Sequence, residues 1–92
     1  MIGSLTVECL LYNPQSLKDK RSIIKKVQSR ASKDLNVAVS ELDFQNLWQR
    51  TLLGFVTISS SKTPAEKELQ RVISILESFP ELEITSTHFE WY

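Results

Sequence analysis

Apolar residues alternate with other residues along the first segment of the chain, between Leu5 and Leu11. A period of two is typical of a β-strand that buries one of its faces. Asn13 and Pro14 follow directly and favour a turn, so the strand is predicted to end before them. The residues predicted to face the core are Leu5, Val7, Cys9 and Leu11, while Thr6, Glu8 and Leu10 are predicted to face away.

The pattern next changes to the period of a helix, over residues 17–34. Its apolar residues recur at spacings of three, four and seven, at Leu17, Ile24, Val27, Ala31 and Leu35. Such spacing places one stripe of the helix against a core. Ser16 stands three residues before Asp19, which resembles the capping box that begins many helices. The sequence therefore predicts a capped amphipathic helix.

A second helix is predicted to begin with Thr63 as its N-cap residue. Pro64 then occupies the first helical position, where its missing N–H group is harmless, and Glu66 lies three residues after the cap. Pro80 ends the helix because proline cannot continue it. The apolar stripe between these limits consists of Leu69, Val72, Ile73, Leu76 and Phe79.

Three further segments have the composition of strands, at residues 36–42, 51–59 and 82–91. The order is then strand, helix, strand, strand, helix, strand, whose usual architecture is the ferredoxin-like βαββαβ fold. This α+β fold has a four-stranded antiparallel sheet with two helices on one face, and its first and third strands are predicted to be central. A chain of 92 residues supports one such domain, spanning 1–92.

One face of such a sheet is left uncovered by the helices. Alternation along residues 51–59 predicts that Leu52, Val56 and Ile58 face the helices. Since a large exposed apolar patch usually marks an interface, we expect a homodimer or a protein partner on the opposite face. Scattered apolar residues on the surface of a monomer are the alternative. The predicted sheet-face interface consists of Leu10, Leu53 and Phe55.

Charged residues balance overall but are segregated along the chain. Lys and Arg number 11 and Asp and Glu number 11, which argues against wholesale capture by nucleic acid or a membrane. Residues 14–34 nevertheless contain seven cations and two acids, whereas residues 77–92 contain four Glu and no cation. A cationic helix face suits phosphate backbones, and a merely solvated face is the alternative. The cations opposite the apolar stripe of the first helix are Lys18, Arg21, Lys25, Lys26, Arg30 and Lys33.

The connection between the second and third strands combines amide, aromatic and cationic side chains. Amides hydrogen-bond base edges, and indole and guanidinium planes stack on bases. Trp48 has the alternative role of covering the edge of the sheet. The complete set of predicted contacts to a nucleic acid or partner is Lys18, Lys20, Arg21, Lys25, Lys26, Arg30, Gln45, Trp48, Gln49 and Arg50.

Stacking of RNA on the sheet itself has little support in the sequence. The third strand of an RNA-recognition motif has the pattern K/R-G-F/Y-G/A-F-V-x-F/Y. The corresponding run is residues 51–58, in which only Gly54, Phe55 and Val56 fit. The leading cation and two of the stacking aromatics are missing, so the first helix is the stronger candidate surface.

No catalytic site, metal site or cofactor is expected. Cys9 is the only cysteine and falls at a predicted core position without a neighbouring histidine, so it is predicted to be an inert buried thiol. His88 is the only histidine and lacks partners for a metal shell. A single cysteine fits a reducing compartment, and no apolar run approaches the roughly 20 residues that span a bilayer. We therefore expect a cytoplasmic, non-enzymatic protein without membrane contact.

Several sequence blocks are shared with a known family. They are Leu17-Lys18-Asp19-Lys20-Arg21, residues 36–41, Leu47-Trp48-Gln49-Arg50, Gly54 and Trp91. Through them, nearly the whole chain resembles the YlxP-like family (DUF503) of small bacterial proteins of unknown function. The resemblance implies a bacterial cytoplasmic protein with a ferredoxin-like fold, often encoded beside genes for transcription elongation, translation initiation and ribosome maturation. It implies no activity, and Ser40 and Phe44 depart from the family pattern.

Two classes of function are compatible with these features. The first is an RNA- or ribosome-associated binding module linked to translation or ribosome maturation. Its partner would be rRNA or a ribosomal particle, contacted by the basic face of the first helix and the Trp48 loop. The second is a protein-interaction module that self-associates or binds a partner through the open sheet face, without nucleic acid.

Overall fold

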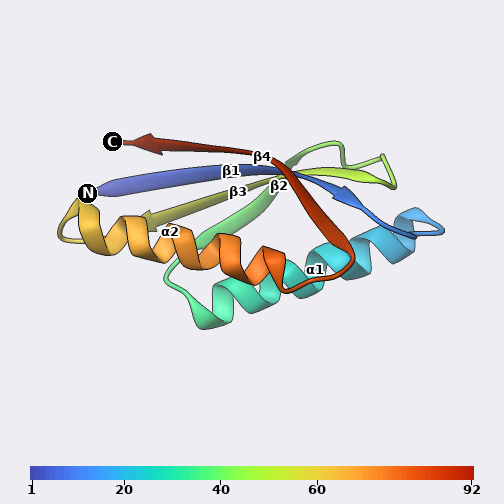
Figure 1. Ribbon diagram of the computed structural model, residues 1–92, viewed down its shortest axis with the longest axis horizontal. Coiled ribbons are helices and arrows are strands. Elements are labelled where there is room, and N and C mark those ends of the chain that lie inside the picture. The colour runs from blue at the N-terminus through green and yellow to red at the C-terminus, as the bar shows by residue number, and fades with distance from the viewer.

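Six elements follow one another in the predicted order in the computed structural model, which describes residues 1–92. They are β1 (Ile2–Leu11), α1 (Leu17–Asp34), β2 (Ala38–Asp43), β3 (Arg50–Ile58), α2 (Lys62–Glu77) and β4 (Leu82–Trp91). The four strands form one antiparallel sheet in the order β2-β3-β1-β4, so the first and third strands are central. Figure 1 shows both helices on the same side of this sheet. The predicted α+β, ferredoxin-like fold is confirmed.

The two helices differ in how they begin. At α1 the Ser16 hydroxyl accepts a hydrogen bond from the Asp19 N–H at 3.1 Å, as the capping pattern predicts. At α2 the N-cap residue is Ser61, whose side chain makes no capping bond, so the prediction of Thr63 is wrong by two residues. Pro64 is accommodated in the first turn because backbone N–H groups there have no partner within the helix.

The pairing of β3 with β1 determines which of its residues enter the core. Leu5 lies opposite Phe55 and Val7 lies opposite Leu53. Residues directly opposite one another share a face of the sheet, so Leu53 and Phe55 face the helices, where they are 0% and 1% exposed. The predicted phase of the third strand is therefore wrong, and neither residue belongs to a sheet-face interface. Leu10 is 39% exposed on the open face, as predicted.

Two threonines explain why the sequence alone does not reveal which residues of β3 face the helices. Thr51 and Thr57 are buried on the helix side, although their side chains are polar. Each hydroxyl is satisfied, because Thr51 donates to Glu41 Oε2 and Thr57 to the Asn36 carbonyl, both at 2.6 Å. The residues on the opposite face of β3 include more aliphatic side chains, so a pattern of hydrophobicity alone predicts that this opposite face is the buried one.

The open face of the sheet carries a different apolar group from the one predicted. Gly54 lies within it and leaves a hollow of about 350 Å³, over which Leu42 packs. A Cβ atom added at Gly54 would lie 2.6 Å from Leu42 Cδ1, so no larger residue fits without a shift. The large exposed residues, called the open-face patch below, are Ile2, Leu10, Leu42, Val56 and Ile58.

The edges of the sheet are β2 and β4. β2 is six residues long and its register with β3 shifts between Glu41 and Asp43. β4 is ten residues long, and Glu83 and Glu90 are exposed along it. Neither helix has the length and apolar character of a membrane span.

Candidate nucleic-acid interface

Four lysines lie on the outer face of α1, because Ile24, Val27 and Ala31 hold the inner face against the core. All four are exposed, and none forms an ion pair with a carboxylate. Arg21 is also exposed and unpaired. The structure therefore presents the predicted cations as free charges on one surface. The four, called the lysine stripe below, are Lys18, Lys25, Lys26 and Lys33.

Arg30 borders the lysine stripe but also makes contacts with other residues of the protein. Its Nε lies 3.6 Å from an Asp34 carboxylate oxygen, and its NH1 donates to the Ser78 hydroxyl at 3.0 Å. The guanidinium carbon also lies 5.9 Å from the centre of the Phe79 ring. The side chain is still half exposed, at 50%, and lines a broad depression of about 810 Å³ together with Lys26 and Lys33.

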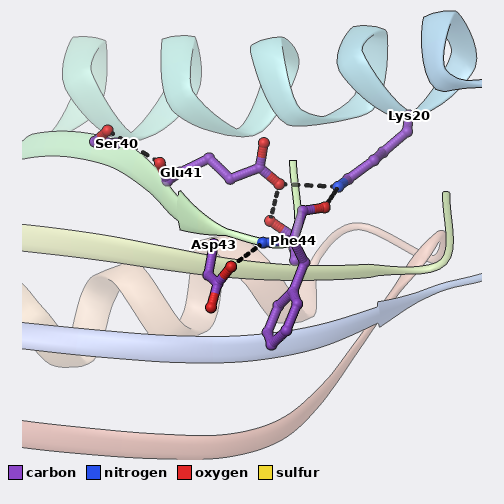
Figure 2. A network of polar contacts seen from close by, with 6 residues as sticks. Lys20, Ser40, Glu41, Asp43 and Phe44 are labelled. Atoms are coloured by element: carbon purple, nitrogen blue, oxygen red, sulfur yellow. Dashed lines mark hydrogen bonds and ion pairs between the residues drawn. The ribbon is translucent and has the colours of Figure 1, made fainter. Parts of the chain in front are cut away.

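Lys20 is buried, so its assignment as a surface contact is wrong. Its side chain is 1% exposed, and its Nζ lies 3.0 Å from Glu41 Oε2. The same Nζ donates to the Phe44 carbonyl at 2.5 Å, and Glu41 Oε2 also accepts from the Thr51 hydroxyl. Figure 2 shows the lysine reaching from α1 toward the end of β2. The network ties the first turns of the helix to the β2–β3 connection.

A signal for this burial exists in the sequence. Lys20 precedes Ile24 by four residues and Val27 by seven, so it falls on the apolar stripe of the helix. Glu41 follows Val39 by two residues and shares its face of β2. A buried cation requires an opposite charge in reach, and these two positions supply the pair.

Phe44 occupies a backbone conformation that few side chains adopt, with φ at 65°. Its N–H donates to Asp43 Oδ1 at 2.7 Å, while its carbonyl accepts from Lys20. The ring lies under the Arg50 guanidinium, 4.0 Å from the ring centre. Arg50 is also hydrogen-bonded and ion-paired to Glu8, at 3.0 and 2.9 Å. Arg50 thus acts mainly within the fold, although its side chain is 44% exposed.

The remaining predicted contacts lie on the loop between β2 and β3. Gln45, Trp48 and Gln49 are all exposed, and Trp48 is 48% exposed and outside the core cluster. The alternative role of Trp48, covering the sheet edge, stays a prediction. Through the Lys20–Phe44 contact the loop lies near the first turns of α1, and both are at the right of Figure 1. The lysine stripe lies on the side of α1 opposite Lys20 and faces away from the sheet, so this contact does not bring the loop and the stripe together.

Cys9 and His88 differ sharply in environment. Cys9 is 0% exposed, and burial, with a smaller effect of the Glu8 charge, raises the pKa of its thiol to about 11. His88 is exposed, with Nε2 3.0 Å from Glu90 Oε1. Hydrogen bonds from the Tyr92 hydroxyl and from His88 lower the pKa of the Glu90 carboxyl. No three metal-ligating side chains are grouped together.

The fold and surface define a small α+β protein of the ferredoxin-like class, with an open sheet face and a lysine-rich helix. Residues 2–89 match the family described as "Protein of unknown function (DUF503)", and the chain belongs to this family. It is 46% identical over 92 residues, which is 100% of both chains, to the "Uncharacterized protein YlxP" of Bacillus subtilis (strain 168). The family resemblance of the sequence blocks is confirmed.

Proposed function

We propose that this protein is a non-enzymatic, cytoplasmic RNA-binding module that associates with rRNA or a ribosomal particle. The observation that carries the proposal is the lysine stripe, four exposed cations without a carboxylate partner. Phosphate backbones bind such surfaces because each contact releases condensed counterions. The loop between β2 and β3 adds amide and aromatic groups at a separate surface, through the exposed Gln45, Trp48 and Gln49.

A helix face whose only role is contact with water could be equally basic, but it would also tolerate acidic residues among its cations. The two acids of α1 have partners within the protein: Asp19 accepts a hydrogen bond from the Gln15 N–H in the first turn, and Asp34 is ion-paired with Arg30. The protein as a whole has a net charge of zero, so general electrostatic attraction is weak and binding depends on this one surface. The charge segregation therefore favours a phosphate-binding role over solvation alone.

Replacing Lys18, Lys25, Lys26 and Lys33 together by glutamine is expected to abolish most RNA association without changing the thermal unfolding midpoint appreciably. All four side chains are exposed and unpaired, so their loss removes no internal contact. The slope of log affinity against log salt should flatten by about three units, because four phosphate contacts are lost. Binding to purified ribosomal RNA over a salt series measures both effects.

The matched control replaces Lys62 and Lys67 of α2 by glutamine, which removes exposed lysines from another part of the surface. This variant should keep the parent's salt slope. A stripe variant that binds RNA as the parent does, or a control that loses binding equally, would refute the proposal.

The open-face patch supports a second candidate, self-association through the uncovered face of the sheet. Its residues are 39–62% exposed, and Ile58 is the most exposed of them at 62%. Apolar burial of this kind drives association with little dependence on salt. The second function would operate without nucleic acid.

The change of Ile58 to glutamate is expected to convert an associated form to monomers while leaving the fold intact. The substitution places a charge where two apolar faces would meet, and 62% exposure leaves room for it in the monomer. Sedimentation velocity over a range of protein concentrations gives the result. Monomers at every concentration for both parent and variant would eliminate this candidate.

A further inference from the structure

The lysines of the lysine stripe are regularly spaced along α1, with serines between them. Lys18, Ser22 and Lys26 are spaced four residues apart, and Lys25, Ser29 and Lys33 repeat this spacing seven residues later. Four residues turn an α-helix by about 40° beyond one full turn, whereas seven residues advance it about 10.5 Å with little rotation. The outer face of α1 therefore has three parallel rows, two of lysine with a row of serine between them.

The serine row is free to bind a ligand. Ser22 and Ser29 are both exposed, and neither hydroxyl has a hydrogen-bond partner in the protein. Ser29 also lines the broad depression beside Arg30. Lysine offers only donors, and serine offers a donor and an acceptor. The face thus carries cationic donors on two sides and free hydroxyl groups between them.

Aromatic side chains are absent from this surface. α1 contains no Phe, Tyr or Trp, and Phe79 beside it is half-buried and covered by Arg30. Phe55, the aromatic residue of β3, points into the core and is not available either. Single-stranded RNA is bound mainly by stacking its bases on aromatic rings. The stripe therefore lacks the groups that a single strand needs.

We propose that the outer face of α1 binds duplex RNA across its minor groove, a refinement that rests on the proposed RNA-binding function. The A-form minor groove is wide and shallow, displays 2′-hydroxyl groups, and is bordered by the two phosphate backbones. The two lysine rows contact the two backbones, and Ser22 and Ser29 contact 2′-hydroxyls. The stripe from Lys18 to Lys33 is about 22 Å long, which allows contact with several successive nucleotides on each strand.

The test compares three probes of one sequence with the full chain, by fluorescence anisotropy at equal salt. The probes are an RNA duplex of about 16 base pairs, the same RNA as a single strand without internal pairing, and the corresponding DNA duplex. The RNA duplex is expected to bind roughly tenfold more tightly than the single strand, because only the duplex presents two backbones to the two lysine rows. It is also expected to bind several-fold more tightly than the DNA duplex, which has no 2′-hydroxyls.

A serine variant separates the two kinds of contact. Replacing Ser22 and Ser29 by alanine should bring the affinity for the RNA duplex down toward that for the DNA duplex, with an unchanged salt slope, because no charge is removed. The change of Ser74 to alanine, an exposed serine of α2, is the matched control and should have no effect.

Each remaining result has a definite meaning. Equal or tighter binding of the single strand overturns the duplex inference and leaves the RNA-binding function standing. Equal affinity for the RNA and DNA duplexes, unaffected by the serine variant, also overturns it. If none of the three probes binds at low salt, both this inference and the proposed function fail.

Discussion

Replacing Lys20 by methionine is expected to destabilise the fold by about 3 to 5 kcal/mol, because it leaves the Glu41 carboxylate mostly buried without its cation. Lys20 Nζ lies 3.0 Å from Glu41 Oε2, and the two side chains are 1% and 15% exposed. The Phe44 carbonyl loses its donor at the same time. Chemical denaturation followed by circular dichroism measures the free energy of unfolding.

The matched control is the change of Lys18 to methionine, two residues earlier on the exposed face of the same helix, and it should have little effect. A double variant that replaces Lys20 by methionine and Glu41 by leucine should recover much of the loss, because an apolar pair needs no compensating charge. Equal stability of the Lys20 and Lys18 variants would mean that the Lys20 amine is solvated in solution.

The change of Phe55 to glutamate is expected to unfold the protein, whereas the same change at the adjacent Val56 is expected to leave it folded. Phe55 is 1% exposed and Val56 is 46% exposed on the opposite face of β3. Loss of a buried phenylalanine costs about 3 to 5 kcal/mol, and burial of a carboxylate adds several more. That sum is comparable to the roughly 5 to 15 kcal/mol of total stability of a natural domain.

Thermal melts of the two variants, recorded by circular dichroism, test this prediction directly. The Phe55 variant should show no cooperative transition, and the Val56 variant should melt within a few degrees of the parent, because surface changes usually alter stability by no more than about 0.5 kcal/mol. A stable Phe55 variant together with an unfolded Val56 variant would show that β3 presents its other face to the helices.

Local periodicity is sufficient to predict the order of the elements and the buried faces of β1, α1 and α2. The alternation from Leu5 to Leu11 is interrupted only at Leu10, and the apolar stripe and capping serine of α1 leave only one phase for that helix. The phase of β3 could not be derived in the same way because both of its faces carry large apolar residues. Pairing with β1, a contact between distant parts of the chain, decides between them.

In the candidate site, too, features set by one helix were predictable, whereas features set by contacts between distant residues were not. The exposed lysines of α1 were predictable because their positions follow from the phase of a single helix. The burial of Lys20 was also implied by that phase, but its partner Glu41 lies 21 residues away, on a strand whose inward face had to be known first. The stacking of Arg50 on Phe44 depends on a turn with positive φ, for which the sequence offers no glycine as a signal.

The unpaired edge of β4 bears on how the protein avoids self-templated aggregation. Ten residues of strand with free backbone groups are long enough to pair with β4 of another copy. Glu83 and Glu90 are exposed near the two ends of this strand, so every copy brings two negative charges to the edge. Charged side chains along an edge strand oppose pairing with another copy, so this edge disfavours its own addition and interrupts the growth of a continuous sheet. Fibril formation is therefore opposed at this edge, while the open face remains free for contacts of defined stoichiometry.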